Sequence, residues 1–68
     1  MNYKVETERE TDGRWLGEID LLPGVTAYGL TREEAIAKTK ALALRVLADR
    51  LDHGEQVPEL AEVFTVSA

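Results

Sequence analysis

The stretch of residues 21–35 constrains the fold more than any other part of this chain, because it combines a strand end, a turn and a helix start. Pro23 lacks the amide hydrogen that a sheet ladder needs, and Gly24 readily takes the positive φ of a tight turn. A strand over residues 14–20 is therefore expected to end just before this turn. Residues 25–30 alternate in a way that predicts a short third strand directly after it.

A capping box opens the next element, since Thr31 and Glu34 stand at the required spacing before an apolar run. In this motif the Thr31 hydroxyl accepts a hydrogen bond from the Glu34 amide, and the Glu34 carboxylate accepts one from the Thr31 amide. The sequence predicts a helix over residues 32–52, closed by Gly54 at the position where glycine commonly ends helices. Its buried stripe is predicted to contain Ile36, Thr39, Ala43, Val46, Leu47 and Arg50, widened by Ala35, Leu42 and Leu51.

The remaining segments are typical of strands. Residues 3–9 alternate between the two faces of a strand, and Asp12–Gly13 predicts a hairpin turn into the strand at residues 14–20. Residues 61–66 are apolar and β-branched, which predicts a fourth strand. The chain is thus expected to be a single α+β domain, residues 1–68, of β-β-β-α-β order. One helix would cover one face of a mixed four-stranded sheet, with the last strand returned in parallel by a right-handed crossover.

Composition limits the class of function. The 68 residues include no cysteine, which excludes disulfides and cysteine-bound zinc, and 13 acidic against 8 basic residues give a net charge of −5. Nucleic-acid binding depends on clustered lysine and arginine, so no direct nucleic-acid partner is expected, whereas an acidic surface suits a basic protein. A core this small commonly gains stability by association, which favours a homo-oligomer. Without a membrane-length apolar run or a leader pattern, a cytoplasmic location is expected, with no membrane partner.

The order and spacing of several short signals resemble the HicB-like antitoxin family over residues 3–66, nearly the whole chain. The signals are the Asp12–Gly13 hairpin, Trp15, Leu22–Pro23–Gly24, Gly29, Thr31-x-x-Glu34–Ala35 and Gly54–Glu55-x-x-Pro58. Two features depart from the family pattern. The acid common just before Leu-Pro-Gly is replaced by Leu21, with Asp20 one residue earlier, and no DNA-binding segment follows up to Ala68. Operator binding is therefore not expected.

The resemblance implies a partial RNase H-like fold. It also implies a non-catalytic antitoxin, or an antitoxin-derived protein, that binds a basic HicA-type ribonuclease toxin and needs no cofactor. The alternative is a solitary homo-oligomeric module with a structural or small-ligand-binding role and no cognate toxin.

Two acidic surfaces are candidates for contact with a basic partner. The first is formed by alternate positions of the predicted hairpin, and consists of Glu6, Glu8, Glu18 and Asp20. The second lies at the helix end and the connector after it, and consists of Asp49, Asp52 and Glu55. The sequence does not choose between them. A metal-dependent nuclease using the first set is a third alternative, and solvated polar positions of a sheet are the simpler interpretation of the same residues.

No catalytic group is predicted. His53, the only histidine, follows the last helical turn, where it interacts favourably with the helix dipole, and it has no serine or cysteine partner for a nucleophilic triad. Because one helix covers only one face of the sheet, apolar side chains on the other face predict an oligomer interface. The expected interface residues are Leu16, Tyr28, Leu30 and Phe64.

Overall fold

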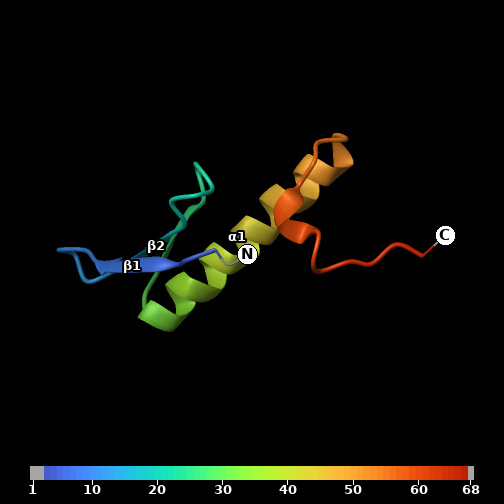
Figure 1. Ribbon diagram of the computed structural model, residues 1–68. Helices are drawn as coiled ribbons and strands as arrows, with labels where there is room; N and C mark the ends of the chain where they lie inside the picture. Colours follow the sequence, from blue (N-terminus) through green and yellow to red (C-terminus); the bar gives the residue numbers. More distant parts are fainter. Residues whose placement is uncertain (1–2, 68) are drawn as a thin grey trace.

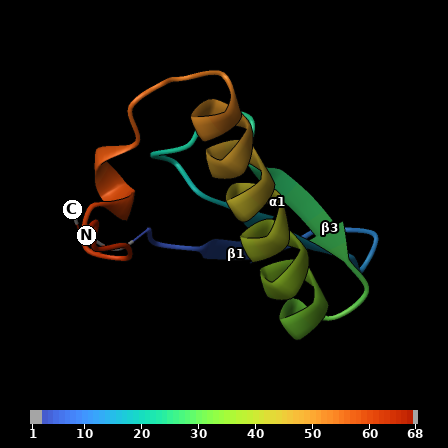
Figure 2. The same cartoon turned by 90° about the vertical axis from the view of Figure 1, so that its right-hand side faces the viewer.

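The computed structural model describes residues 3–67 and shows an α+β fold with one helix packed on one face of a small sheet (Figure 1). The strands are β1 (Glu6–Arg9), β2 (Trp15–Glu18) and β3 (Thr26–Gly29). They are followed by the helix α1 (Arg32–Asp52) and by a single 3-10 turn, η1 (Pro58–Leu60). Figure 2 shows α1 lying obliquely across the strands.

The sheet is an antiparallel meander of order β1-β2-β3, and two rows of residues across it face the helix. The rows are Thr7–Gly17–Ala27 and Arg9–Trp15–Gly29. A Cβ built on Gly17 would collide with the Thr39 hydroxyl, and one built on Gly29 would stand 2.5 Å from the Ala35 amide nitrogen. Both positions therefore require glycine for α1 to approach the sheet this closely. We call the opposite side of the sheet the outer face.

The connection between β2 and β3 supplies much of the core. The Ile19 amide donates to the Val25 carbonyl at 3.2 Å, and the Val25 amide donates to the Leu22 carbonyl at 3.0 Å, which closes a tight turn. Gly24 in this turn takes a φ of 85°. Leu22 and Val25 are each only 1% exposed, whereas Leu21 points to solvent. The buried apolar cluster consists of Ile19, Leu22, Val25, Ala43, Leu47 and Val57.

Both predicted ends of the helix are confirmed, and its N-terminus carries one difference in detail. The Glu34 amide donates to the Thr31 Oγ1 at 3.1 Å, as the capping box requires. The Glu34 carboxylate accepts from the Leu30 amide at 3.2 Å rather than from the Thr31 amide. At the other end, Gly54 has a φ of 76° and its amide donates to the Leu51 carbonyl. The Glu55 amide donates to the Arg50 carbonyl, and the two hydrogen bonds together form a Schellman cap.

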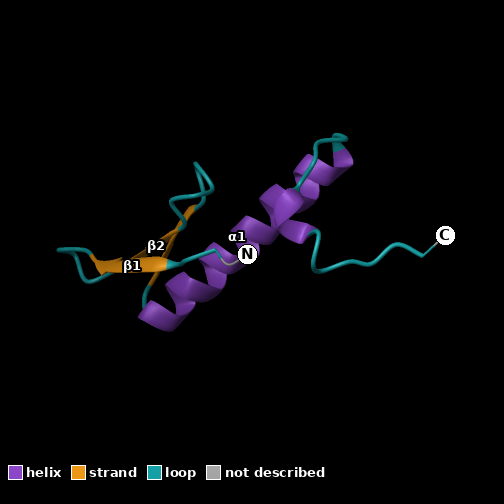
Figure 3. Cartoon of the chain, viewed as in Figure 1, coloured by secondary structure: helices purple, strands orange, loops and turns teal. Residues whose placement is uncertain are grey.

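The predicted fourth strand and the predicted mixed sheet are not found in the described residues. We call residues 61–67 the C-terminal segment. Its last main-chain hydrogen bond runs from the Val63 amide to the Leu60 carbonyl at 3.0 Å, and the chain then leads away from the sheet (Figures 1 and 3). A strand exists only where a neighbouring main chain pairs with it. Sequence preference alone does not supply that neighbour, and the sheet described here is purely antiparallel.

Candidate functional site

Three carboxylates converge on the outer face of the sheet. Glu6 on β1 and Glu18 on β2 are direct cross-strand partners, and Asp20 follows two residues later. One oxygen from each of the three lies within 4.8 Å of the others. Glu8 lines the same shallow pocket of about 70 Å³ with Glu6 and Glu18. The structure thus brings together the first acidic surface predicted from sequence, and we call Glu6, Glu18 and Asp20 the acidic cluster.

The acidic cluster is electrostatically unfavourable in the free protein. Like charges directly opposite one another on antiparallel strands are destabilising, by roughly 0.2–1 kcal/mol for a pair. Lys4 gives limited relief, because its Nζ lies 3.6 Å from the Glu6 Oε1 on a side chain that is 84% exposed. Chemically, the arrangement suits a partner that brings positive charge. Three carboxylate oxygens would also supply about half of the ligands that a hard divalent cation takes.

The same face carries an aromatic side chain held by an arginine. The Arg14 guanidinium lies 4.5 Å from the centroid of the Tyr28 ring, a cation–π distance. Asp12 fixes this arginine, accepting from the Arg14 amide at 3.0 Å and from its Nε at 2.8 Å. The hydrogen bond from the Arg14 amide, and then the one from its side chain, lower the pKa of Asp12. The hairpin turn therefore positions Arg14 beside the outer face.

Three of the four residues predicted to form an oligomer interface lie near one another. Leu16 and Tyr28 are direct cross-strand partners on the outer face, and Leu30 lines a hollow with Tyr28 and Arg14. Phe64 lies elsewhere, against the second half of α1.

Sequence reasoning missed a second surface, which runs along α1. One groove, of about 280 Å³, is lined by Tyr3, Val5, Ile19, Lys40, Ala43, Leu44 and Leu47. We call it the edge groove, because Tyr3 and Val5 lead into β1, the edge strand of the sheet. A neighbouring groove, of about 210 Å³, is lined by Leu44, Leu47, Ala48, Leu51, Leu60, Val63 and Phe64. The signal was present in Leu44, which with Leu47 and Leu51 makes the apolar side of α1 wider than the sheet can cover. Leu51 was predicted to be buried but is 48% exposed.

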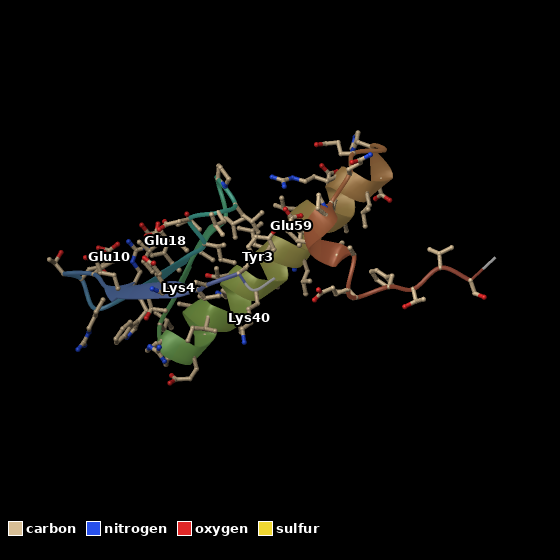
Figure 4. All side chains as sticks on the ribbon, in the orientation of Figure 1. Tyr3, Lys4, Glu10, Glu18, Lys40 and Glu59 are labelled. Atoms are coloured by element: carbon tan, nitrogen blue, oxygen red, sulfur yellow. The ribbon has the colours of Figure 1, made fainter. Side chains whose placement is uncertain are left out.

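Tyr3, which lines the edge groove, lies near Glu59 of η1 (Figure 4). The Tyr3 hydroxyl and the Glu59 Oε2 are both buried. Neither atom forms a hydrogen bond with another of the described residues. Burial of the hydroxyl, and next the Glu59 carboxylate, raise the pKa of Tyr3. Tyr3 and Leu60 of η1 both pack against the apolar core.

The second acidic surface lies at the C-terminal end of α1, where Asp49 contacts His53. The Nδ1 of His53 lies 2.8 Å from the Asp49 carbonyl oxygen and 3.4 Å from the Asp49 Oδ1. His53 thus caps the last turn, as its position in the sequence predicts. Asp52 and Glu55 are exposed beside it.

These features define a small α+β protein with an acidic outer face and an apolar groove at its sheet edge. No protein-family model matches the chain, and no solved structure matches it. The chain is 30% identical to the UPF0150 protein Ta0767 of Thermoplasma acidophilum, over 69 aligned positions that cover 100% of both proteins. The chain therefore belongs to the UPF0150 family. No helix within residues 3–67 is long and apolar enough to cross a membrane.

Proposed function

We propose that this protein is a HicB-like antitoxin, or a protein derived from one, which acts without catalysis. It would bind a basic HicA-type ribonuclease and cover the RNA-binding surface of that toxin. The proposal includes the partial RNase H-like character of the fold, in which a fourth strand beside β1 completes the sheet.

Three lines of support come from the chain as a whole. The order of three strands and then a helix agrees with the first four elements that the HicB resemblance implies. The elements that carry the resemblance also have structural roles, since Leu22 is a core residue, Gly29 permits close helix packing and Thr31 caps α1. Membership of the UPF0150 family is compatible with a HicB-like protein, although the relative's name assigns no activity.

The acidic cluster is the observation that carries the proposal. A domain of this size has little stability to spare, yet it holds Glu6 and Glu18 directly opposite one another with Asp20 close by. A lysine or arginine from a partner would turn this repulsion into attraction. Complementary charge of this kind also raises the rate at which two proteins meet. The second acidic surface is weaker in this respect, because the Asp49 carboxylate lies beside the His53 ring and no convergence of three carboxylates is found there among the described residues.

The test is a binding titration with a purified HicA-type toxin from the same genome, together with an assay of its RNA cleavage. We expect a stoichiometric complex that suppresses cleavage. The double variant Glu6→Gln/Glu18→Gln should raise the dissociation constant about tenfold, equivalent to roughly 1.4 kcal/mol, and should reduce the salt dependence of binding.

The matched control is Asp52→Asn/Glu55→Gln, which removes the same charge from the second acidic surface. It should change the dissociation constant by no more than about twofold. Equal losses in the two double variants would show that net charge alone, rather than the acidic cluster, drives binding. Absence of binding would reject the toxin partner. Magnesium-dependent RNA cleavage by the chain itself, lost in Glu18→Gln, would replace the proposal with a nuclease.

A homo-oligomeric module without a toxin is the second candidate, and a specific observation favours it. Leu44 and Leu51 on α1 are 65% and 48% exposed, and both line apolar grooves. A stable oligomer that binds no HicA-type toxin would support this candidate over the first.

A further inference from the structure

The C-terminal segment has the side chains of a strand but no strand partner within the described part of the chain. Val63, Phe64 and Val66 are 63%, 67% and 92% exposed. Figure 4 shows the side chains of this segment standing clear of the sheet. Residues 61–63 form a turn and residues 64–67 have no regular secondary structure. An exposed apolar stretch of this kind can pair with the edge of a sheet once it extends.

A matching acceptor lies on the same molecule. Within residues 3–67, β1 pairs only with β2, so its other side is an open edge. The edge groove lies between the stretch that leads into β1 and α1, and its helix wall includes Leu44. A strand added beside β1 would place every second side chain over this wall. Leu44 is 65% exposed, and a strand added at this edge would cover it.

The segment does not reach that edge in its own chain. Val57 is buried in the core and Leu60 packs against it, so the chain is anchored at η1 before the C-terminal segment begins. From η1 the segment runs away from the sheet (Figure 1). The longest dimension of the molecule is 52 Å, against 20 Å and 16 Å for the other two.

The exposed surface is larger than that of a compact monomer of this mass. A compact monomer of 7.6 kDa exposes about 4,300 Å², whereas this chain exposes 5269 Å². The excess of roughly 1,000 Å² is similar to the ~800 Å² that each partner buries in a stable interface. The radius of gyration is 14.0 Å, against about 11 Å for a compact domain of this length.

We propose that two copies of this chain exchange their C-terminal segments. In the dimer, residues 61–67 of one copy lie along the open edge of β1 in the other. Phe64 and Val66, which project to the same side of an extended segment, enter the partner's edge groove and cover Leu44. The exchange supplies the fourth strand from a second copy. It goes beyond the proposed function and needs no toxin.

The first experiment measures mass and dissociation constant by sedimentation over a range of concentrations. The wild-type chain should dimerise. Val66→Lys and Leu44→Lys should each raise the dissociation constant about tenfold or more, because each places a charge in the groove. Both residues are exposed in the single chain, so its helix content should not change. Thr65→Lys, which projects to the other side of the segment, should change the constant by no more than about twofold.

The second experiment locates the segment in the dimer. The chain has no cysteine, so Ser67→Cys accepts a single nitroxide label. This labelled chain is mixed with an isotope-labelled chain that carries no nitroxide. We expect intermolecular broadening of the β1 amides and of Leu44. A monomer at all concentrations overturns the proposal, as does a dimer in which the broadening falls on Tyr28 and Leu30 instead of β1.

Discussion

The helix–sheet interface and the C-terminal segment contrast sharply in what stabilises them. At the interface, Gly17 and Gly29 bring the sheet against α1 so closely that a methyl group would collide with its backbone or its Thr39 side chain. Every element there has its partner within the same chain. The C-terminal segment has a sequence as apolar as a strand, yet it is drawn as a loop in Figure 3. A segment with high strand propensity thus forms a strand only where a neighbouring main chain can pair with it.

The largest expected effect compares one core residue with one residue of the C-terminal segment. Leu47 is 4% exposed and Phe64 is 67% exposed. Leu47→Ala should lower the free energy of unfolding by about 2–5 kcal/mol, because it leaves a cavity in the core. Phe64→Ala should change it by less than about 0.5 kcal/mol. Urea denaturation followed by circular dichroism, at protein concentrations where the chain is monomeric, measures both. Similar losses would contradict the comparison.

The next effect tests the close approach of the helix to the sheet. Gly29→Ala should lower the free energy of unfolding by about 1–3 kcal/mol, since the added Cβ meets backbone atoms of Glu34 and Ala35 that cannot easily move. Gly13→Ala is the control, because its Cβ meets nothing within 4 Å and only the backbone conformation, with φ of 90°, resists the change. A fully stable Gly29→Ala variant would show that the helix stands further from the sheet.

The acidic cluster predicts a smaller effect of the opposite sign. Glu18→Gln should stabilise the free protein by a few tenths of a kcal/mol, and by no more than about 1 kcal/mol, because it removes a like charge opposite Glu6. The gain should shrink at high salt. Thermal melts of Glu18→Gln and Asp52→Asn, compared at low and high ionic strength, check this. A destabilised Glu18→Gln would mean that the carboxylate makes a stabilising contact in the free chain.

The smallest effect concerns the joint between β3 and α1. The hydrogen bond from the Leu30 amide, and next the contact with Lys38, lower the pKa of Glu34 from its usual 4.5. A carboxyl with a lowered pKa in the folded state stabilises the protein above its unfolded pKa, and this contribution is lost as pH falls through the folded pKa. Glu34→Gln should therefore lower the melting temperature at neutral pH.

The same substitution should make little difference at a pH below the range in which carboxyl groups titrate. Glu33→Gln controls for the loss of a negative charge near the helix N-terminus. A difference between wild type and Glu34→Gln that persists unchanged at low pH would show that the ionised form of Glu34 is not the stabilising one.

Local signals made most of the fold predictable from sequence. The helix over residues 32–52 was delimited by a capping box and a C-terminal glycine, both of which act within a few residues of the chain. The hairpin turn fixed the register that puts Glu6 opposite Glu18, so the first acidic surface was also predictable. Each of these features depends on residues that are close in sequence or paired by a short turn.

The remaining features depend on distant contacts. The prediction of a fourth strand was wrong because residues 61–66 do not reach the edge of the sheet in their own chain. Their sequence alone does not show which main chain lies beside them. Leu44 was not recognised as part of an exposed apolar groove, because its exposure depends on which segment lies beside β1. Phe64 was grouped with Tyr28 on the assumption that the segment joins the sheet, and the structure places it against α1 instead.

Amide hydrogen exchange across a dilution series tests the central claim most directly, that the C-terminal segment finds its strand partner only in a second chain. At low concentration the amides of residues 61–67 should exchange without protection while those of β2 remain protected. As the dimer forms, protection of the segment and of β1 should rise together with the dimer fraction. Protection of the segment that is already complete in the monomer would contradict the account.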